Sequence, residues 1–272
     1  AVLVALLVAG MFGATEVAQP FVVLDCDAGP LVGSSAAWDC AASSGGATTV
    51  SIIAAPSVLN PVTLNDTASG NIVDQALGSG TATTYANLSA GVLGNIPQVA
   101  KVIEVSEDGT TVSFAIRDAL PFSDGSPATA DDLLYWFHDV GFNPNLPNSA
   151  SSAWSCADGS PFNVAADGQT ITVTCTAPFR TFAGNAGSLG MWSKSMALDL
   201  IDVQGIATTE GVTGPQATAE FMGLGIDISL LRGVGPFVLN QFVSDQTAVY
   251  SRNPNFYEVD SNGTQLPYLD SF

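Results

Sequence analysis

Basic side chains are the scarcest feature of this sequence. Its 272 residues include only 6 Lys and Arg against 25 Asp and Glu, so the formal net charge is −19. Because such a surface repels phosphate backbones, the composition excludes nucleic acid as a partner. Hydrophobic residues make up 47% and charged residues 11%. We interpret the acidity as a solvated surface that keeps an apolar protein soluble, the alternative being a surface that attracts cations.

Motifs of catalysis and of cofactor binding are also missing. The single histidine, His138, would have to serve any Ser-His-Asp or Cys-His arrangement, and it lies in an apolar helical segment. No G-x-S-x-G elbow, phosphate loop or dinucleotide fingerprint is present. Asp131 and Asp132 are adjacent, so on a helix they point in different directions. The sequence therefore does not predict an enzyme, and it predicts no cofactor.

The four cysteines lack a C-x-x-C pair, so they do not indicate a zinc site. Cys26 and Cys40 flank one stretch rich in small residues, and Cys156 and Cys175 flank a polar loop. Four cysteines allow three pairings, of which neighbour pairing, 26–40 and 156–175, is the simplest. Each closed loop would contribute about 3 kcal/mol to stability. Free buried thiols are the alternative.

One apolar run stands out, at the start of the chain. Its uninterrupted part is shorter than the roughly 20 residues that a spanning helix needs. Residues 1–19 are better explained as the remnant of a secretory signal peptide with a small-residue cleavage zone, although the initiator Met and a basic n-region are absent. A membrane anchor is the alternative. Both predict a protein that works outside the cytoplasm, periplasmic or at the cell surface.

Patterns of strand and helix become clear in the middle of the chain. After a loose lead-in over 20–47, residues 48–56 are typical of a buried strand. Alternation of Val112, Phe114 and Ile116 predicts a half-buried strand, and Thr129 with Asp132 resembles a capping box ahead of a short helix. Further strands are predicted around 169–178 and 235–254. Strands and helices mix irregularly, without an internal repeat.

Four stretches in order resemble one family, the large extracytoplasmic solute-binding proteins of ABC importers for peptides or nickel. SEDGTTVSFAIRDALPFSDGSPATADDLLYWF is similar to the family's D-G-x-x-Y-T-F-x-L-R strand followed by F-x-D-G-x-P-x-T-A-x-D-V. GVGPFVLNQF resembles G-T-G-P-Y-x-L, and SRNPNFYEVDSNGTQLPYLDSF resembles R-N-P-x-Y-W with the next strand. VLNPVTLNDTAS resembles the L-D-P loop. The resemblance covers 48–272, without the family's V-Y-E-G-L helix.

This resemblance implies a fold class: α/β, the N-terminal lobe of a type II periplasmic-binding-protein-like fold, with the extra domain of the oligopeptide-binding branch. Residues 48–60 plus 167–272 would build the ligand-facing domain of this lobe, and 61–166 the extra domain. The chain ends in LPYLD, which resembles the strand leading to the hinge. The second lobe is therefore expected to be missing, and we expect these residues alone to bind nothing tightly.

The resemblance also implies ligand-binding residues. The loop TLNDT would place Asn65 and Asp66 against the ligand with Thr67 beside them; the alternative is an Asx-type turn that caps the next helix. Trp192 lies where the family's chain returns towards the cleft, so its indole would stack on a ligand or pack in the core.

The resemblance implies a monomeric substrate-binding component of an ABC transporter rather than an enzyme. It would capture oligopeptides, dipeptides or another small solute and deliver them to a membrane permease. One alternative is an extracellular β-rich adhesin or structural module, which explains the low charge but not the ordered motifs. Another is a secreted hydrolase that uses two carboxyl groups with separated pKa values.

Overall fold

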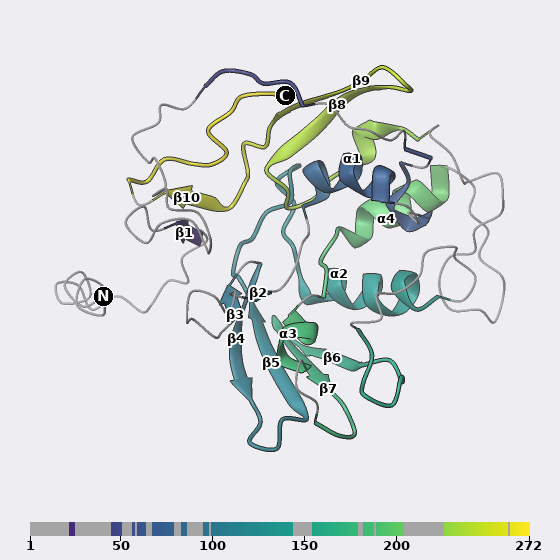
Figure 1. The fold of residues 1–272 in the computed structure, drawn as a ribbon, viewed down its shortest axis with the longest axis vertical. Helices are drawn as coiled ribbons and strands as arrows, with labels where there is room; N and C mark the ends of the chain where they lie inside the picture. The colour runs from purple at the N-terminus through teal and green to yellow at the C-terminus, as the bar shows by residue number, and fades with distance from the viewer. Residues whose placement is uncertain are drawn as a thin grey trace.

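The computed structural model describes 22–24, 45–50, 56–57, 59–63, 67–78, 83–85, 95–97, 99–143, 154–178, 182–187, 189–203, 226–260 and 262–272. These residues form two adjoining regions, one around strands β4 to β7 and one around helix α1 and the β8–β9 hairpin (Figure 1). The predicted signal-peptide remnant, most of the lead-in, and Cys26 and Cys40 lie outside the described residues.

The first region is built on a four-stranded antiparallel sheet. Its strands are β4 (Ala100–Val105), β5 (Thr111–Ile116), β6 (Asn163–Asp167) and β7 (Thr170–Thr174), in the spatial order β4-β5-β7-β6. β5 buries Val112, Phe114 and Ile116 and leaves the alternate residues partly exposed, which confirms the predicted half-buried strand. A short hairpin, β2 (Thr83–Tyr85) with β3 (Asn95–Pro97), lies beside β4.

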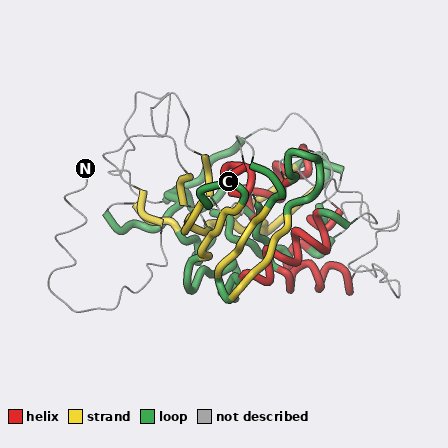
Figure 2. Tube along the Cα trace, turned by 90° about the horizontal axis from the view of Figure 1, so that it is seen from below, coloured by secondary structure: helices red, strands yellow, loops and turns green. Residues whose placement is uncertain are grey.

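Helices cover this sheet and close its core. They are α2 (Ala130–Tyr135), which continues as a π-helical turn over Trp136–Gly141, and α3 (Phe182–Gly187). Seen from below, the helices lie mainly to one side of the strands (Figure 2). We call the buried apolar cluster between them the sheet core; it includes Val112, Phe114, Leu133, Phe137, Phe162, Ile171 and Phe182.

A disulfide bond between Cys156 and Cys175 ties the loop before β6 to the end of β7. The predicted pairing of these two cysteines is therefore confirmed, and no described cysteine is free. None of the helices among the described residues is both long enough and apolar enough to cross a membrane.

The second region joins helix α1 (Thr67–Leu77) to a hairpin of β8 (Phe237–Val243) and β9 (Thr247–Arg252). The 3-10 turns Pro61–Thr63 and Ile228–Leu230 and helix α4 (Lys194–Val203) complete it. We call its buried cluster the helix–hairpin core; it includes Leu59, Val73, Leu77, Met196, Leu239 and Tyr250. Trp136 belongs to this core while its neighbour Phe137 belongs to the sheet core, so the π-helical turn lies between the two.

The hairpin is widened by the last residues of the chain. Tyr250 N–H donates to the carbonyl of Phe272 at 2.7 Å, so the C-terminal residues run antiparallel beside β9. On their other side lie residues 45–48, because Asp270 N–H donates to the carbonyl of Gly46 at 2.9 Å and Ala47 pairs with Ser271 in parallel. Nearby, β1 (Val22–Leu24) pairs in parallel with β10 (Glu258–Asp260).

The capping box predicted at the start of α2 is present, with Asp132 in the place of the usual Glu. Its Oδ2 accepts hydrogen bonds from the N–H of Thr129 at 2.8 Å and from the Thr129 hydroxyl at 2.9 Å. Its Oδ1 accepts a third, at 2.7 Å, from the N–H of Lys194, the first residue of α4. One buried carboxylate therefore caps two helices that lie far apart in the sequence.

Three of the motifs that carry the family resemblance meet at the end of α1. Val234 N–H donates to the carbonyl of Leu77 at 3.1 Å, which satisfies one of the free carbonyls of that helix. The carbonyl of Gly233 accepts from Ser123 N–H at 2.9 Å, and the Asn255 amide donates to Ser123 at 3.0 Å. A Cβ on Gly235 would lie 2.5 Å from the Ala76 carbonyl oxygen, so only glycine fits there.

The two cores do not follow the predicted domain boundaries at every point. Helix α1, which falls inside the predicted extra domain 61–166, packs in the helix–hairpin core with β8. The boundary at 166/167 falls at the end of β6, and β6 pairs with β7 in one sheet. The division into domains stays a prediction, and these placements would move its boundaries.

Candidate functional site

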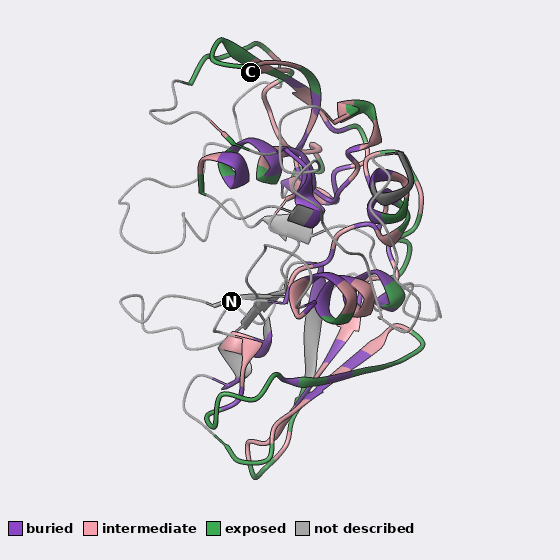
Figure 3. Ribbon diagram, turned by 90° about the vertical axis from the view of Figure 1, so that its right-hand side faces the viewer, coloured by how far each residue is buried: buried purple, intermediate pink, exposed green. Residues whose placement is uncertain are grey.

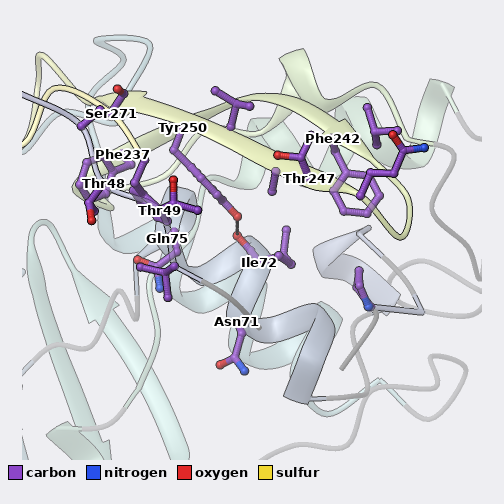
Figure 4. A pocket seen from close by; sticks show the side chains of 18 of the residues that line it. Thr48, Thr49, Asn71, Ile72, Gln75, Phe237, Phe242, Thr247, Tyr250 and Ser271 are labelled. Atoms are coloured by element: carbon purple, nitrogen blue, oxygen red, sulfur yellow. Dashed lines mark hydrogen bonds between the residues drawn. The ribbon is translucent and has the colours of Figure 1, made fainter. Parts of the chain in front are cut away.

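A cavity of about 970 Å³ opens between α1, the β8–β9 hairpin and the extended segments 47–50 and 269–272 (Figure 4). Each wall follows from the fold described above: the hairpin and the C-terminal residues form one extended surface, and α1 crosses beneath it. The size suits a small solute or a short stretch of a longer one. Residues far apart in the sequence are therefore brought to one opening.

The floor of the cavity is apolar and rigid. Phe272 stacks on Tyr250 with ring centroids 4.5 Å apart and meets Phe237 edge to face at 4.7 Å. The Tyr250 hydroxyl donates to the carbonyl of Ile72 at 2.8 Å, which ties the hairpin to α1 (Figure 4). Burial raises the pKa of Tyr250 above its ordinary value. Its phenol therefore stays neutral, and its proton is already used inside the protein.

The polar groups at the opening are almost all uncharged. They comprise the amides of Asn71 and Gln75 on α1 and the hydroxyls of Thr48, Thr49, Thr247 and Ser271, with Gln246 at the hairpin turn. Among the described residues that line the cavity, Asp245 is the single charged one. Such a lining offers hydrogen bonds and an apolar surface, which are the means of binding an uncharged solute.

Of the residues predicted to bind ligand, the two that the structure describes, Thr67 and Trp192, do not line this cavity. Asn65 and Asp66 lie outside the described residues. Thr67 is the first residue of α1 and is exposed, one helical turn before Asn71. Asn71 and Gln75 were not singled out from the sequence, although their spacing of four residues after Thr67 places them along the same side of a helix.

Trp192 lies at the other end of α1. Its indole N–H donates to the carbonyl of Gly78 at 3.0 Å, and its ring meets Trp136 edge to face with centroids 4.9 Å apart. The side chain is half-buried and packs against the helix–hairpin core. Stacking of Trp192 on a ligand stays a prediction, since its indole proton is already donated within the protein.

Metal-binding groups do not gather in the part of the chain that the structure describes. No set of three or more His, Cys, Asp and Glu residues is placed there to hold a metal ion. His138 lies outside the cavity; its Nε2 is 3.1 Å from the carbonyl oxygen of Val164, and its ring meets Phe137 edge to face.

Comparison with known proteins agrees with the motifs that meet at α1. Residues 95–272 match the family model of bacterial extracellular solute-binding proteins, family 5, middle part. The chain belongs to this family. The predicted family is thereby confirmed.

Curated relatives cover a range of solutes. A probable ABC transporter-binding protein of Deinococcus radiodurans is 27% identical over 198 residues, 66% of this chain and 29% of that protein. The periplasmic alpha-galactoside-binding protein of Rhizobium meliloti is 26% identical over 178 residues, 64% and 24% of the two chains. The oligopeptide-binding protein OppA of Bacillus subtilis is 34% identical over 88 residues, 32% and 15%. The chain thus spans less than a third of the length of these relatives.

Among solved structures, the periplasmic binding protein MelB from Agrobacterium fabrum, in complex with stachyose, has a TM-score of 0.69. The two sequences are 20% identical, and the likeness covers 97% of this chain and 38% of MelB. At this identity the match speaks for the fold alone. It confirms the predicted α/β fold class of the periplasmic binding proteins.

Proposed function

We propose that this chain is part of the substrate-binding component of an ABC importer, which captures oligopeptides or dipeptides outside the cytoplasm and delivers them to a membrane permease. The observation that carries the proposal is the match to family 5 over 95–272. The oligopeptide-binding relative, at 34% identity, supports the choice of peptides. We also propose that the protein acts as a monomer.

The mechanism follows from binding in a cleft that closes. In proteins of this type, two lobes close around the ligand by bending at a hinge, and the transporter recognises the closed form. A peptide held in extended form is recognised mainly through its main-chain N–H and C=O groups, as an added strand would be. Asn65, Asp66 and Thr67 are proposed to contact it from the loop before α1, and Trp192 is proposed to stack on it.

Neutral oligosaccharides are a second candidate ligand. The Rhizobium relative binds alpha-galactosides by its name, and MelB was solved with stachyose. The cavity beside α1 favours this class as well, because aromatic rings, amides and hydroxyls line it and Asp245 is the one charged group among its described residues. Sugars and peptide main chains are both uncharged hydrogen-bonding ligands, so this lining does not choose between them.

Native mass spectrometry of the full-length gene product, purified without denaturation, tests the proposal. A series of short peptide masses released on activation would support peptides as the ligand. One discrete saccharide mass would keep the importer and replace peptides by sugars. A protein that carries no bound mass, and whose melting temperature does not change with peptide or oligosaccharide mixtures, would contradict the proposed function. A variant with Asp66→Ala then checks the proposed contact in the loop.

A further inference from the structure

We infer that the side-chain amides of Asn71 and Gln75 are the specificity-determining groups of the cavity beside α1, and that they select an uncharged ligand with hydroxyl or amide groups. This inference rests on the proposed function and names the residues that would recognise the solute. Both residues line the cavity and lie four positions apart on one helix, so their side chains are neighbours.

The two amides are available to a ligand. Asn71 is exposed and Gln75 is half-buried, and neither side chain has a hydrogen-bond partner among the residues that the structure describes. By contrast, two backbone carbonyls of the same helix are already used: the carbonyl of Ile72 accepts from Tyr250, and the carbonyl of Asp74 accepts from Gly78 N–H. A side-chain amide offers two donors and one acceptor, so each residue can both give and take hydrogen bonds.

The helix that carries the amides is held firmly. Its other face buries Ile72, Val73, Ala76 and Leu77 in the helix–hairpin core, and its last turn is bonded to Val234. Figure 4 shows Ile72 turned towards Tyr250, whereas Asn71 leaves the helix on a different side. Because the helix backbone is held in place, the points from which the two side chains extend are fixed, and α1 itself need not become ordered when a ligand binds.

The described lining of the cavity carries little charge. No described Lys, Arg or His lines the cavity, so these residues offer a carboxylate or phosphate no counter-charge. The net charge of −19 would repel such an anion as well. Among the described lining residues, Asp245 on the exposed hairpin turn is the single group that would attract a cationic ligand. The lining therefore favours an uncharged ligand, whose affinity should change little with salt concentration.

Isothermal titration calorimetry on the full-length protein tests the inference with two probes: stachyose, a neutral tetrasaccharide, and a tetra-alanine peptide blocked at both ends. We expect Asn71→Ala and Gln75→Ala each to weaken binding of the accepted probe about tenfold, because each removes hydrogen bonds to the ligand. Asp74→Asn, on the same helix but outside the cavity, is the matched control and should leave the affinity within about twofold. Melting curves check that every variant is folded.

The two probes distinguish the two ligand classes. Binding of stachyose would identify a saccharide as the ligand, and binding of the blocked peptide would identify a peptide held by its main chain. Wild-type affinity in both amide variants would overturn the inference and leave the proposed function standing. An equal loss in Asp74→Asn would also overturn it, because the effect would then belong to the helix as a whole. If the wild-type protein binds neither probe, the inference and both proposed ligand classes fail together.

Discussion

The sheet core and the helix–hairpin core both bury apolar side chains, but the two regions differ in where such side chains meet solvent: Val105, 47% exposed, ends the strand β4 of the sheet, whereas two exposed valines of the other region line the cavity. In the sheet, Val112 and Phe114 are at most 1% exposed, and a disulfide fastens the edge of the region. At the cavity beside the other core, Val50 is 66% exposed and Val249 37% exposed, and both line the opening. Figure 3 shows the buried residues along the inner sides of the elements and the exposed ones on the outer turns.

This difference indicates separate roles for the two regions, one in the stability of the fold and the other in binding. A buried core stabilises the fold through the apolar area that it removes from water. An opening lined by exposed apolar side chains and unused amides gives up part of that area, and exposed apolar groups of this kind mark sites of interaction. We therefore expect the region of the sheet core to serve as the scaffold and the region of the helix–hairpin core to contact the solute.

The close contact between the GVGP segment and α1 requires glycine at positions 233 and 235, so Gly235→Ala should disturb this contact with a large effect. The added Cβ would lie 2.5 Å from the Ala76 carbonyl oxygen and 2.6 Å from the Gly78 nitrogen, and neither backbone atom can move freely. We expect a loss of more than about 3 kcal/mol in the free energy of unfolding, measured by urea denaturation.

A glycine in open space is the control for this variant. Gly168 adopts φ +59° with nothing within 4 Å of the added Cβ, so Gly168→Ala meets only the strain of a left-handed backbone, about 1 kcal/mol. Equal losses for the two variants would show that the close approach of Gly235 to α1 contributes nothing beyond backbone conformation.

Removing the disulfide with Cys156→Ser and Cys175→Ser together tests the contribution of the sheet region to stability. The bond joins residues 19 apart in the sequence, and opening a loop of that length lowers stability by about 3 kcal/mol through the entropy of the unfolded chain. We expect hydrogen exchange to speed up first in β6 and β7. Faster exchange in β8 and β9 with no change in β6 would contradict a scaffold fastened at the sheet.

Much of the sheet region could be predicted from the sequence because its signals are local. Alternating residues specify β5, the Thr129–Asp132 spacing specifies the start of α2, and neighbouring cysteines form the disulfide. The third hydrogen bond of Asp132, from Lys194 N–H, could not be predicted, because the two residues are 62 positions apart and meet only when α2 and α4 pack.

The candidate site was harder to predict for the same reason. Asn71 and Gln75 look like the solvated face of an amphipathic helix, and no local pattern distinguishes them. Their position at a cavity depends on the hairpin, whose Tyr250 reaches Ile72 across 178 positions of sequence. The motif GVGP was recognised as one that resembles the family, but the contact of its glycines with α1 is visible only in the fold.

The smallest expected effect is that of acid pH. It tests whether the turns of the two regions open together. In the sheet region, Asp108 accepts a hydrogen bond from the Ser106 hydroxyl and Asp158 one from the Ser160 hydroxyl, each at 2.6 Å, and these bonds hold the pKa of both carboxyls below the ordinary value of 3.8. Asp227 has the same bond from Ser229 in the other region, with its pKa also lowered.

A carboxyl whose pKa is lower in the folded state stabilises the protein above its ordinary pKa, and this contribution disappears as the pH falls through the folded value. In Asp108→Asn with Asp158→Asn, the amide oxygen keeps the turn but cannot titrate. We therefore expect acid, from about pH 5 down to about pH 3, to accelerate hydrogen exchange in β5 to β7 less in this variant than in the wild type. Asp227→Asn should act on the turn before β8 instead. If either variant changes exchange equally in both regions, the regions unfold as one unit and the comparison between scaffold and binding region does not extend to their stability.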